Sequence, residues 1–80
     1  MAVQENRFET LDDEALLRHL ADVANKRREH LVIEERAGAW IAETWTSGGL
    51  AGRSVMLGAT GSNRRSAMLG LARRFEADRW

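Results

Sequence analysis

The N-terminal half of this 80-residue chain repeats its apolar residues at helical spacing. When residues are turned by about 100° each, the apolar positions after Leu11 gather on one side of a helix. These positions are Leu16, Leu17, Leu20, Val23, Ala24 and Leu31. A second set also fits a helix, with its stripe rotated by roughly a quarter turn, and consists of Ile33, Ala37, Trp40 and Ile41. The pattern predicts that residues 11–46 are almost wholly helical, as one helix that changes face near His30 or as two helices joined there.

Polar residues and glycines indicate where the predicted N-terminal helix begins and ends. Thr10 is suited to the N-cap, and the three acids at residues 12–14 would complement the helix dipole in the first turn. Residues 1–9 are predicted to form a flexible arm that is held by Phe8. The pair Gly48-Gly49 stands where a helix commonly stops.

A separate helix is predicted over residues 62–77, with Ser62 or Asn63 as its cap. Its apolar side consists of Ala67, Met68, Leu71 and Phe75, and its opposite side of Asn63, Ser66, Gly70, Arg73 and Arg74. Gly70 costs such a helix about 1 kcal/mol relative to Ala. The glycine therefore indicates close approach to another surface, either a ligand or partner, or a neighbouring helix of the same fold.

Charge is sorted along the chain, although its 12 acidic and 12 basic residues cancel. The segment from Thr44 to Phe75 has no Asp or Glu but carries Arg53, Arg64, Arg65, Arg73 and Arg74. Two of these arginines open the predicted C-terminal helix, where backbone N–H groups already favour phosphate. Nucleic acid is therefore the ligand that the charge pattern favours. The basic run at residues 26–28 is interpreted mainly as part of an ion-paired surface, although it could also touch phosphates.

The small size of the chain favours self-association. A domain of this length buries roughly 60% of its unfolded surface, so a monomer would be marginally stable. The chain has no cysteine, which excludes support from disulfides. A homodimer is expected, with a seam of Leu16, Leu17, Leu20 and Val23. No apolar run approaches the roughly 18 residues of a membrane span, so no membrane partner and a cytoplasmic location are expected.

The segment from Gly48 to Phe75 resembles the helix-turn-helix of small bacterial and phage DNA-binding proteins. In that pattern, residues 55–57 would be the short first helix, Gly61 the turn, and residues 62–66 the start of a recognition helix. Such a unit follows a long charged helix in relatives of sigma-factor region 4. The resemblance implies double-stranded DNA as the ligand. The residues expected to bind it are Arg53, Ser62, Asn63, Arg64, Arg65, Ser66, Arg73 and Arg74.

A second resemblance competes for the same segment. The run Gly58-Ala59-Thr60-Gly61 is similar to the strand-plus-loop of extended short-chain dehydrogenases. Arg64 stands where that fingerprint needs a third glycine, and the chain is too short for the further βα units. Residues 50–60 are therefore left open: helix supports the helix-turn-helix, and strand supports the dehydrogenase-like segment.

No group of side chains in the sequence indicates an enzyme, a metal site or a cofactor. His19 and His30 lack a third ligand, and the serines lack a placed base. Trp40 and Trp45 are predicted to lie near one another at the core edge. Trp80 is predicted to pack over the last helix or to anchor a partner.

These observations predict a single all-α domain over residues 1–80, with three to five helices. Residues 10–46 would be a helical, dimerising half and residues 47–80 a half containing the helix-turn-helix. The predicted function is sequence-specific or architectural DNA binding, as a small transcriptional regulator or phage-type accessory factor. The alternative is a protein-interaction module, such as an antitoxin-like protein, inhibitor or adaptor, whose arginine face binds an acidic protein surface. The net charge of zero favours this alternative slightly.

Overall fold

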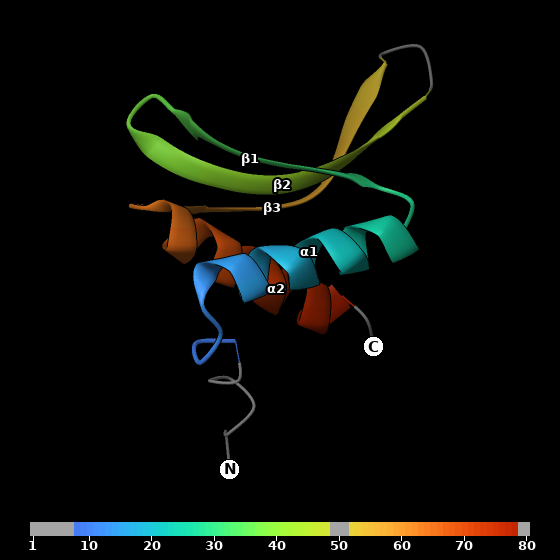
Figure 1. Cartoon of the computed structure of the whole chain (residues 1–80). Helices are drawn as coiled ribbons and strands as arrows, with labels where there is room; N and C mark the ends of the chain where they lie inside the picture. The colour runs from blue at the N-terminus through green and yellow to red at the C-terminus, as the bar shows by residue number, and fades with distance from the viewer. Residues whose placement is uncertain (1–7, 49–51, 79–80) are drawn as a thin grey trace.

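The computed structural model describes residues 8–48 and 52–78, which form a two-layer α+β fold (Figure 1). The elements follow in the order α1 (Asp13–Lys26), β1 (His30–Arg36), β2 (Ala39–Ser47), β3 (Arg53–Gly61) and α2 (Arg64–Asp78). The three strands form one antiparallel sheet in the order β1-β2-β3. Both helices lie on the same side of this sheet (Figure 1).

The prediction of an all-α fold is wrong, because the middle of the chain is a sheet. The predicted helix over residues 11–46 is confirmed only as α1, and the change near His30 is the start of β1. Residues 55–57 lie inside β3, so the described chain has no short helix before Gly61 and no helix-turn-helix. The predicted C-terminal helix is confirmed as α2. The Gly49 part of the predicted helix stop and residues 1–7 of the arm lie outside the described residues.

Helix α1 begins one residue after a different cap from the one predicted. The Asp12 carboxylate, not Thr10, accepts a hydrogen bond from the backbone N–H of Ala15 at 2.8 Å. The helix ends where Arg28 takes a positive φ of 61°, and the following backbone N–H of Glu29 donates to the Ala24 carbonyl. This turn sends the chain directly into β1.

Strands β1 and β2 are joined by a two-residue turn at Ala37 and Gly38. Both residues have positive φ, at 54° and 84°, which matches the turn type that suits a right-handed hairpin. The resulting register pairs Ile33 with Ala42 and Leu31 with Thr44, so these side chains share the sheet face that packs on the helices.

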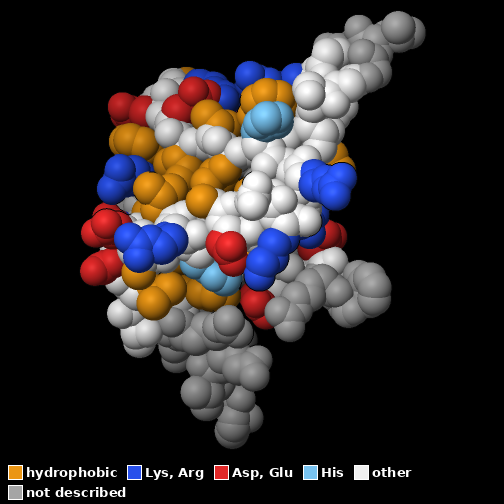
Figure 2. All heavy atoms as spheres, turned by 45° about the vertical axis from the view of Figure 1, so that its right-hand side comes forward, with side chains coloured by type: hydrophobic (Ala, Val, Ile, Leu, Met, Phe, Trp, Pro, Cys, Tyr) orange, Lys and Arg blue, Asp and Glu red, His pale blue; other side chains and the backbone are white. Residues whose placement is uncertain are grey.

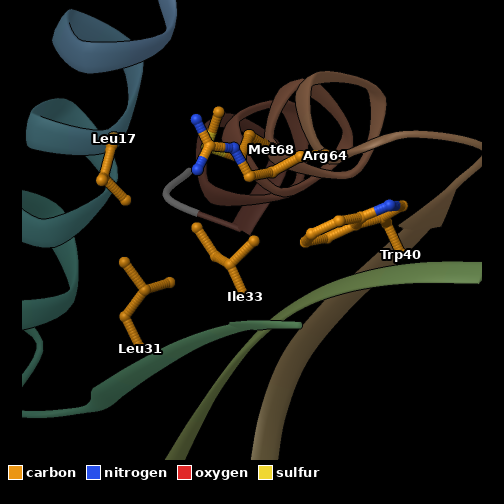
Figure 3. Close-up of a pocket in the computed structure, with 6 residues that line it drawn as sticks. All are labelled: Leu17, Leu31, Ile33, Trp40, Arg64 and Met68. Atoms are coloured by element: carbon orange, nitrogen blue, oxygen red, sulfur yellow. The ribbon is translucent and has the colours of Figure 1, made fainter. Parts of the chain in front are cut away.

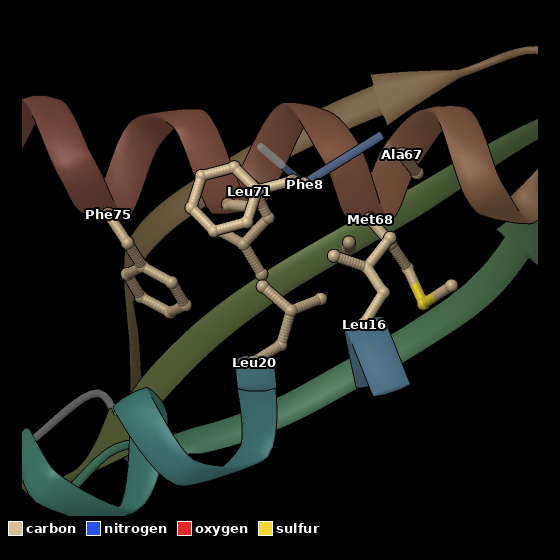
Figure 4. Close-up of a cluster of buried hydrophobic side chains, with 9 residues drawn as sticks. Phe8, Leu16, Leu20, Ala67, Met68, Leu71 and Phe75 are labelled. Carbon is tan, nitrogen blue, oxygen red and sulfur yellow. The ribbon is translucent and has the colours of Figure 1, made fainter. Parts of the chain in front are cut away.

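The hydrophobic core lies between the sheet and the two helices. Figure 4 shows Leu16 and Leu20 of α1 pointing toward Leu71 and Met68 of α2, and all four side chains are fully buried. Phe8, at 4% exposure, lies in the same cluster and attaches the segment before α1 to the core, as the sequence predicts.

Helix α2 approaches β3 closely because small residues face one another. A Cβ atom added at Gly70 would lie 2.8 Å from the Cβ of Ala59, closer than two carbon atoms can approach without a shift. Gly70 therefore serves the contact between α2 and β3 within the fold. The surface that accounts for its cost to the helix is a strand of the same chain.

Replacing Thr44 is expected to stabilise the protein, whereas most substitutions in a core destabilise it. Its side chain is fully buried in the middle of β2, and its hydroxyl oxygen has no hydrogen-bond partner. Replacement by valine removes this unpaired polar group and keeps the shape, so we expect Thr44→Val to raise the free energy of unfolding by about 1 kcal/mol. Urea unfolding measures the change, with Thr60→Val as an exposed control on β3. A loss of stability in Thr44→Val would contradict this account.

Candidate functional site

The residues predicted to bind DNA are not gathered in one exposed cluster. Arg53 begins β3, at the opposite end of that strand from the start of α2. The Asn63 side chain caps α2 by accepting a hydrogen bond from the backbone N–H of Ser66 at 2.8 Å. Ser62 and Ser66 are exposed. The role that the structure shows among these three polar residues is the helix cap that Asn63 forms.

Arg65 is tied to the segment that precedes α1. Its guanidinium group donates to the Asp13 carboxylate at 2.8 Å, the Glu9 carbonyl at 2.9 Å and the Leu11 carbonyl at 2.6 Å. Arg73 likewise donates to the Glu9 carboxylate at 2.8 Å. These two arginines therefore join α2 to residues 9–13, and Arg65 already makes three hydrogen bonds inside the fold.

The remaining arginines of the predicted set have fewer partners. Arg64 lies 3.7 Å from the second oxygen of Asp13, whose first oxygen is bound by Arg65. Arg53 and Arg74 have no carboxylate partner among the described residues. Arg64, Arg53 and Arg74 are therefore the members of the set that remain open to another anion.

The basic run at residues 26–28 is largely ion-paired. Lys26 lies 3.4 Å from Asp22, and Arg27 contacts both Glu29 at 3.0 Å and Asp78 at 3.1 Å. The hydrogen bond that the Arg27 guanidinium group donates to the Glu29 carboxylate is the main cause that raises the pKa of Arg27 above its ordinary value. The pairing with Asp78 joins the ends of the two helices, so this run supports the fold more clearly than it offers a phosphate site.

The predicted dimer seam is split between the core and the surface. Leu16 and Leu20 are fully buried within their own chain and have no surface to offer a partner. Val23 is half-buried and packs against the same core. Leu17 differs, because 39% of its surface is exposed. Leu17 is exposed because it lines an open groove.

An apolar groove of about 360 Å³ lies where α1, α2 and the sheet meet. Leu17 of α1, Leu31 and Ile33 of β1, Trp40 of β2 and Met68 of α2 line it. Figure 3 shows these side chains directed toward a common space, with the indole of Trp40 on one side. The groove is open to solvent because α1 turns Leu16 and Leu20 toward α2 and leaves Leu17 beside β1 (Figures 3 and 4).

One positively charged side chain, that of Arg64, lies at the edge of this groove. The Arg64 guanidinium group lines it (Figure 3), and the Arg64 side chain is 51% exposed. Glu35 pairs with Trp40 in the register of β1 and β2, so it shares this face of the sheet, but it is exposed. The groove thus combines aliphatic walls, one indole ring and one guanidinium group that a carboxylate could reach. Figure 2 shows hydrophobic side chains gathered at the surface of one face, with basic and acidic side chains around them.

The two histidines of the chain lie in different surroundings. His19 lies against Phe8, with ring centroids 5.0 Å apart, and His30 stacks on Trp45, so the two histidines do not meet. In the described chain, no group of three or more His, Asp or Glu side chains could hold a metal ion. Neither of the described helices is long and apolar enough to cross a membrane.

The dehydrogenase-like segment has the expected strand followed by a helix, but the strand beside it runs in the wrong direction for a dinucleotide fold. Residues 53–61 form a strand that leads into α2, as that resemblance requires. However, β3 is antiparallel to β2, and the described residues contain no parallel strand. A dinucleotide fold needs parallel strands joined by crossover helices, so this segment does not form a cofactor site.

The three tryptophans do not form one cluster. Trp40 faces the groove and packs against the core, whereas Trp45, five residues later on β2, lies on the opposite face of the sheet. The prediction that these two side chains lie together is therefore wrong, because side chains alternate along a strand. Trp80 lies outside the described residues.

Comparison with protein-family models, with curated proteins and with solved structures finds no match to this chain. The groove and the surfaces described above are therefore the basis for a functional assignment. The groove is not evident from the local pattern of the sequence. Its one available signal was the alternation of apolar residues at Leu31, Ile33 and, after the turn, Trp40.

Proposed function

We propose that the protein is a protein-interaction module that binds a short segment of a partner protein in the groove beside α1. The occupant has a large apolar side chain next to a carboxylate. The apolar side chain enters between Leu17 and Ile33, and the carboxylate pairs with Arg64. This is the class of the alternative prediction, with the binding residues moved from an arginine face to an apolar groove.

The observation that carries the proposal is the uncovered apolar surface of the groove. A small domain needs its apolar side chains for its own core, so apolar surface left open requires an explanation. Leu17, Ile33 and Trp40 line an open space of about 360 Å³, which is large enough for a bulky side chain. Apolar surface of this kind, with a charged rim, is typical of recognition sites. Arg64 supports an acidic partner residue, because Asp13 is shared with Arg65 and leaves Arg64 only a long contact of 3.7 Å.

The charge distribution supports a protein partner over duplex DNA. Affinity for duplex DNA comes largely from cations that neutralise phosphates. Here Arg65 and Arg73 already contact carboxylates, and the net charge of the chain is zero. An apolar groove also has no use in contacts with a phosphate backbone, whereas it suits the side chain of a peptide.

Selection from a library of random peptides tests the proposal. We expect the enriched sequences to carry a large apolar residue next to Asp or Glu. Leu17→Glu places a charge in the groove and should weaken binding of a selected peptide by at least about ten-fold. Arg64→Ala should weaken the acidic peptide but not its Gln or Asn analogue, because only the carboxylate uses the guanidinium group.

Arg74→Ala is the matched control, since Arg74 is an exposed arginine of α2 that does not line this groove. Circular dichroism must show that each variant stays folded. The proposal is rejected if Leu17→Glu binds the same peptides equally well, or if no peptide is enriched. It is also rejected if titration with mixed duplex DNA gives steeply salt-dependent binding that the groove variants do not share.

A further inference from the structure

Strand β3 forms one edge of the sheet, because the strand order is β1-β2-β3 (Figure 1). Its backbone pairs with β2 on one side, and no described strand pairs with its other side. An edge strand presents a row of N–H and C=O groups that can pair with a strand of another chain. The free edge of β3 therefore offers backbone hydrogen bonds to a further strand.

The two edges of the sheet differ in charge. Strand β1 carries Glu34, Glu35 and Arg36 in succession, and charged side chains are a common protection of an edge against pairing. Strand β3 has no charged residue after Arg53, because residues 54–61 read Ser-Val-Met-Leu-Gly-Ala-Thr-Gly. A neighbouring strand can approach this edge without opposing or burying a charge. Of the two edges, β3 is therefore the one suited to pairing.

Two large apolar side chains of β3 are exposed to solvent. Val55 is 56% exposed and Met56 is 48% exposed. Val55 lies on the outer face of the sheet, away from the helices, because its partner Trp45 alternates with the buried Thr44. Met56 is the extra residue of the bulge in β3, and its sulfur lies 3.9 Å from the hydroxyl oxygen of Thr46, on the helix side. One strand thus exposes an apolar side chain on each face.

The same strand has a hollow on each face, next to the exposed side chains. On the outer face, Gly58 pairs with Glu43 and has no side chain of its own. On the helix side, Leu57 lines a cavity of about 170 Å³ together with the C-terminal turn of α2. Each face of β3 therefore carries one projecting apolar side chain and one hollow.

We propose that β3 binds β3 of a second copy of this chain as an antiparallel pair around a two-fold axis, which joins the two sheets into one. In one register, Val55 of each copy lies opposite Gly58 of the other. The same register places Met56 opposite Leu57, so the axis passes between these two positions. Each copy then fills the hollows of the other on both faces, and a two-fold interface requires such a self-complementary surface.

The bulge in β3 favours a second copy over an unrelated strand. In the proposed register Ser54 falls opposite Ala59, and both lie on the helix side because their partners in β2 do. In regular strands, positions five apart point to opposite faces, so this match depends on the extra residue in each copy. A bulge usually discourages pairing by bending an edge. A two-fold axis through the bend gives both strands the same curvature, so β3 matches a strand with its own irregularity.

A second copy also supplies stabilisation that a small domain lacks. Eighty residues without a disulfide make a marginal core, and pairing at β3 covers Val55 and Met56. Strands β1 and β3 are opposite edges of the sheet, and the residues that line the groove beside α1 lie on α1, β1, β2 and α2. The dimer therefore leaves that groove open, and the two proposals can fail separately.

Sedimentation over a wide range of protein concentration tests the dimer. We expect the wild-type chain to dimerise and Met56→Lys to weaken association at least about ten-fold, because each lysine would meet the other copy beside the axis. Leu17→Glu is the matched control, since it also places a charge on an exposed apolar residue but lies in the groove. It should leave the dimer unchanged, and circular dichroism must show that both variants stay folded.

Exchange of the projecting side chain and the hollow on the outer face tests the register. Val55→Gly removes the side chain and Gly58→Val fills the hollow, so each should weaken association at least about ten-fold. A valine fits at position 58 within one copy, because its Cβ would lie 3.4 Å from the Cβ of Glu43, in ordinary contact. The double variant should recover most of the loss. This coupling should appear in the association constant and not in the unfolding of the dilute monomer.

Three results would overturn the inference. The first is a well-folded monomer at every concentration, or a dimer that Met56→Lys leaves intact. The second is a dimer that the exchange of Val55 and Gly58 does not restore, since it would be paired through another register or surface. The third is a wild-type monomer that binds an extended peptide and loses it in Met56→Lys, which would assign the edge of β3 to a different partner.

Discussion

Arg65→Ala is expected to lower the free energy of unfolding by about 2–3 kcal/mol, because the guanidinium group makes charge-assisted hydrogen bonds to three acceptors. The side chain is 32% exposed, so water replaces part of what is lost and the effect stays below that of a fully buried ion pair. Arg65→Lys should recover little of the loss, since an ammonium group cannot match the planar fork that spans Asp13 and two carbonyls. Urea unfolding measures each value.

Arg74→Ala is the control for this substitution. Arg74 belongs to the same helix, is exposed and has no carboxylate partner among the described residues, so its replacement should change stability by less than about 0.5 kcal/mol. Equal losses of unfolding free energy in the two variants would show that the Arg65 contacts do not stabilise the fold. The comparison also separates a structural arginine from a ligand-binding one, because only the former affects the protein without ligand.

Gly70→Val is expected to cost about 3 kcal/mol, the second large effect. The new Cβ would fall 2.8 Å from the Cβ of Ala59, so α2 must move away from β3 or distort. The branched side chain adds further atoms to the same contact. Ala59→Gly should reduce the cost of Gly70→Val, because it opens space at the point of collision, and this coupling is measured by a double-mutant cycle.

Ala77→Val is the matched control for the glycine substitution, because Ala77 is an exposed position of α2. It should cost only the difference in helix propensity, which is below about 1 kcal/mol. If Gly70→Val costs no more than Ala77→Val, or if Ala59→Gly brings no relief, the close approach of α2 to β3 does not limit residue size at this position.

Both helices could be predicted from the sequence because their signals are local. In α1, Leu16 and Leu20 repeat at helical spacing behind acids that suit a first turn, and α2 begins at a real cap, Asn63. The sheet could not be separated from helix on the same grounds. Ile33, Trp40 and Ile41 satisfy a helical stripe by coincidence, while their true period is that of strands.

The turn between β1 and β2 lacks the residues by which a hairpin is usually predicted from sequence. Its first residue is Ala37, which rarely adopts a positive φ, so the sequence lacks the Asn-Gly or Asp-Gly pair that usually marks such a turn. Only Gly38 indicated a break. The neighbouring run Leu31-Val32-Ile33 favours strand, but it is too short to outweigh a helical pattern that extends on both sides.

The candidate site depends on contacts that no local pattern contains. Arg65 was expected to meet phosphate, and its actual partner, Asp13, lies 52 positions earlier in the chain. The groove likewise joins Leu17 of α1 to Arg64 of α2. Arg64 and Arg65, at the start of α2, both contact the Asp13 carboxylate of the same chain. Which anion they meet was decided by the packing of α1 beside α2.

The ties between α2 and residues 9–13 have a consequence for the order in which the protein can fold during synthesis. Met68, Leu71 and Phe75 complete the core, and Arg65 and Arg73 fix the segment that carries Phe8. A nascent chain that ends at β3 therefore has α1 and a sheet but nothing to cover their apolar sides. It stays exposed to aggregation and proteolysis until α2 leaves the ribosome. We therefore expect this domain to reach its folded state in one step once α2 is available, because the core is incomplete without it.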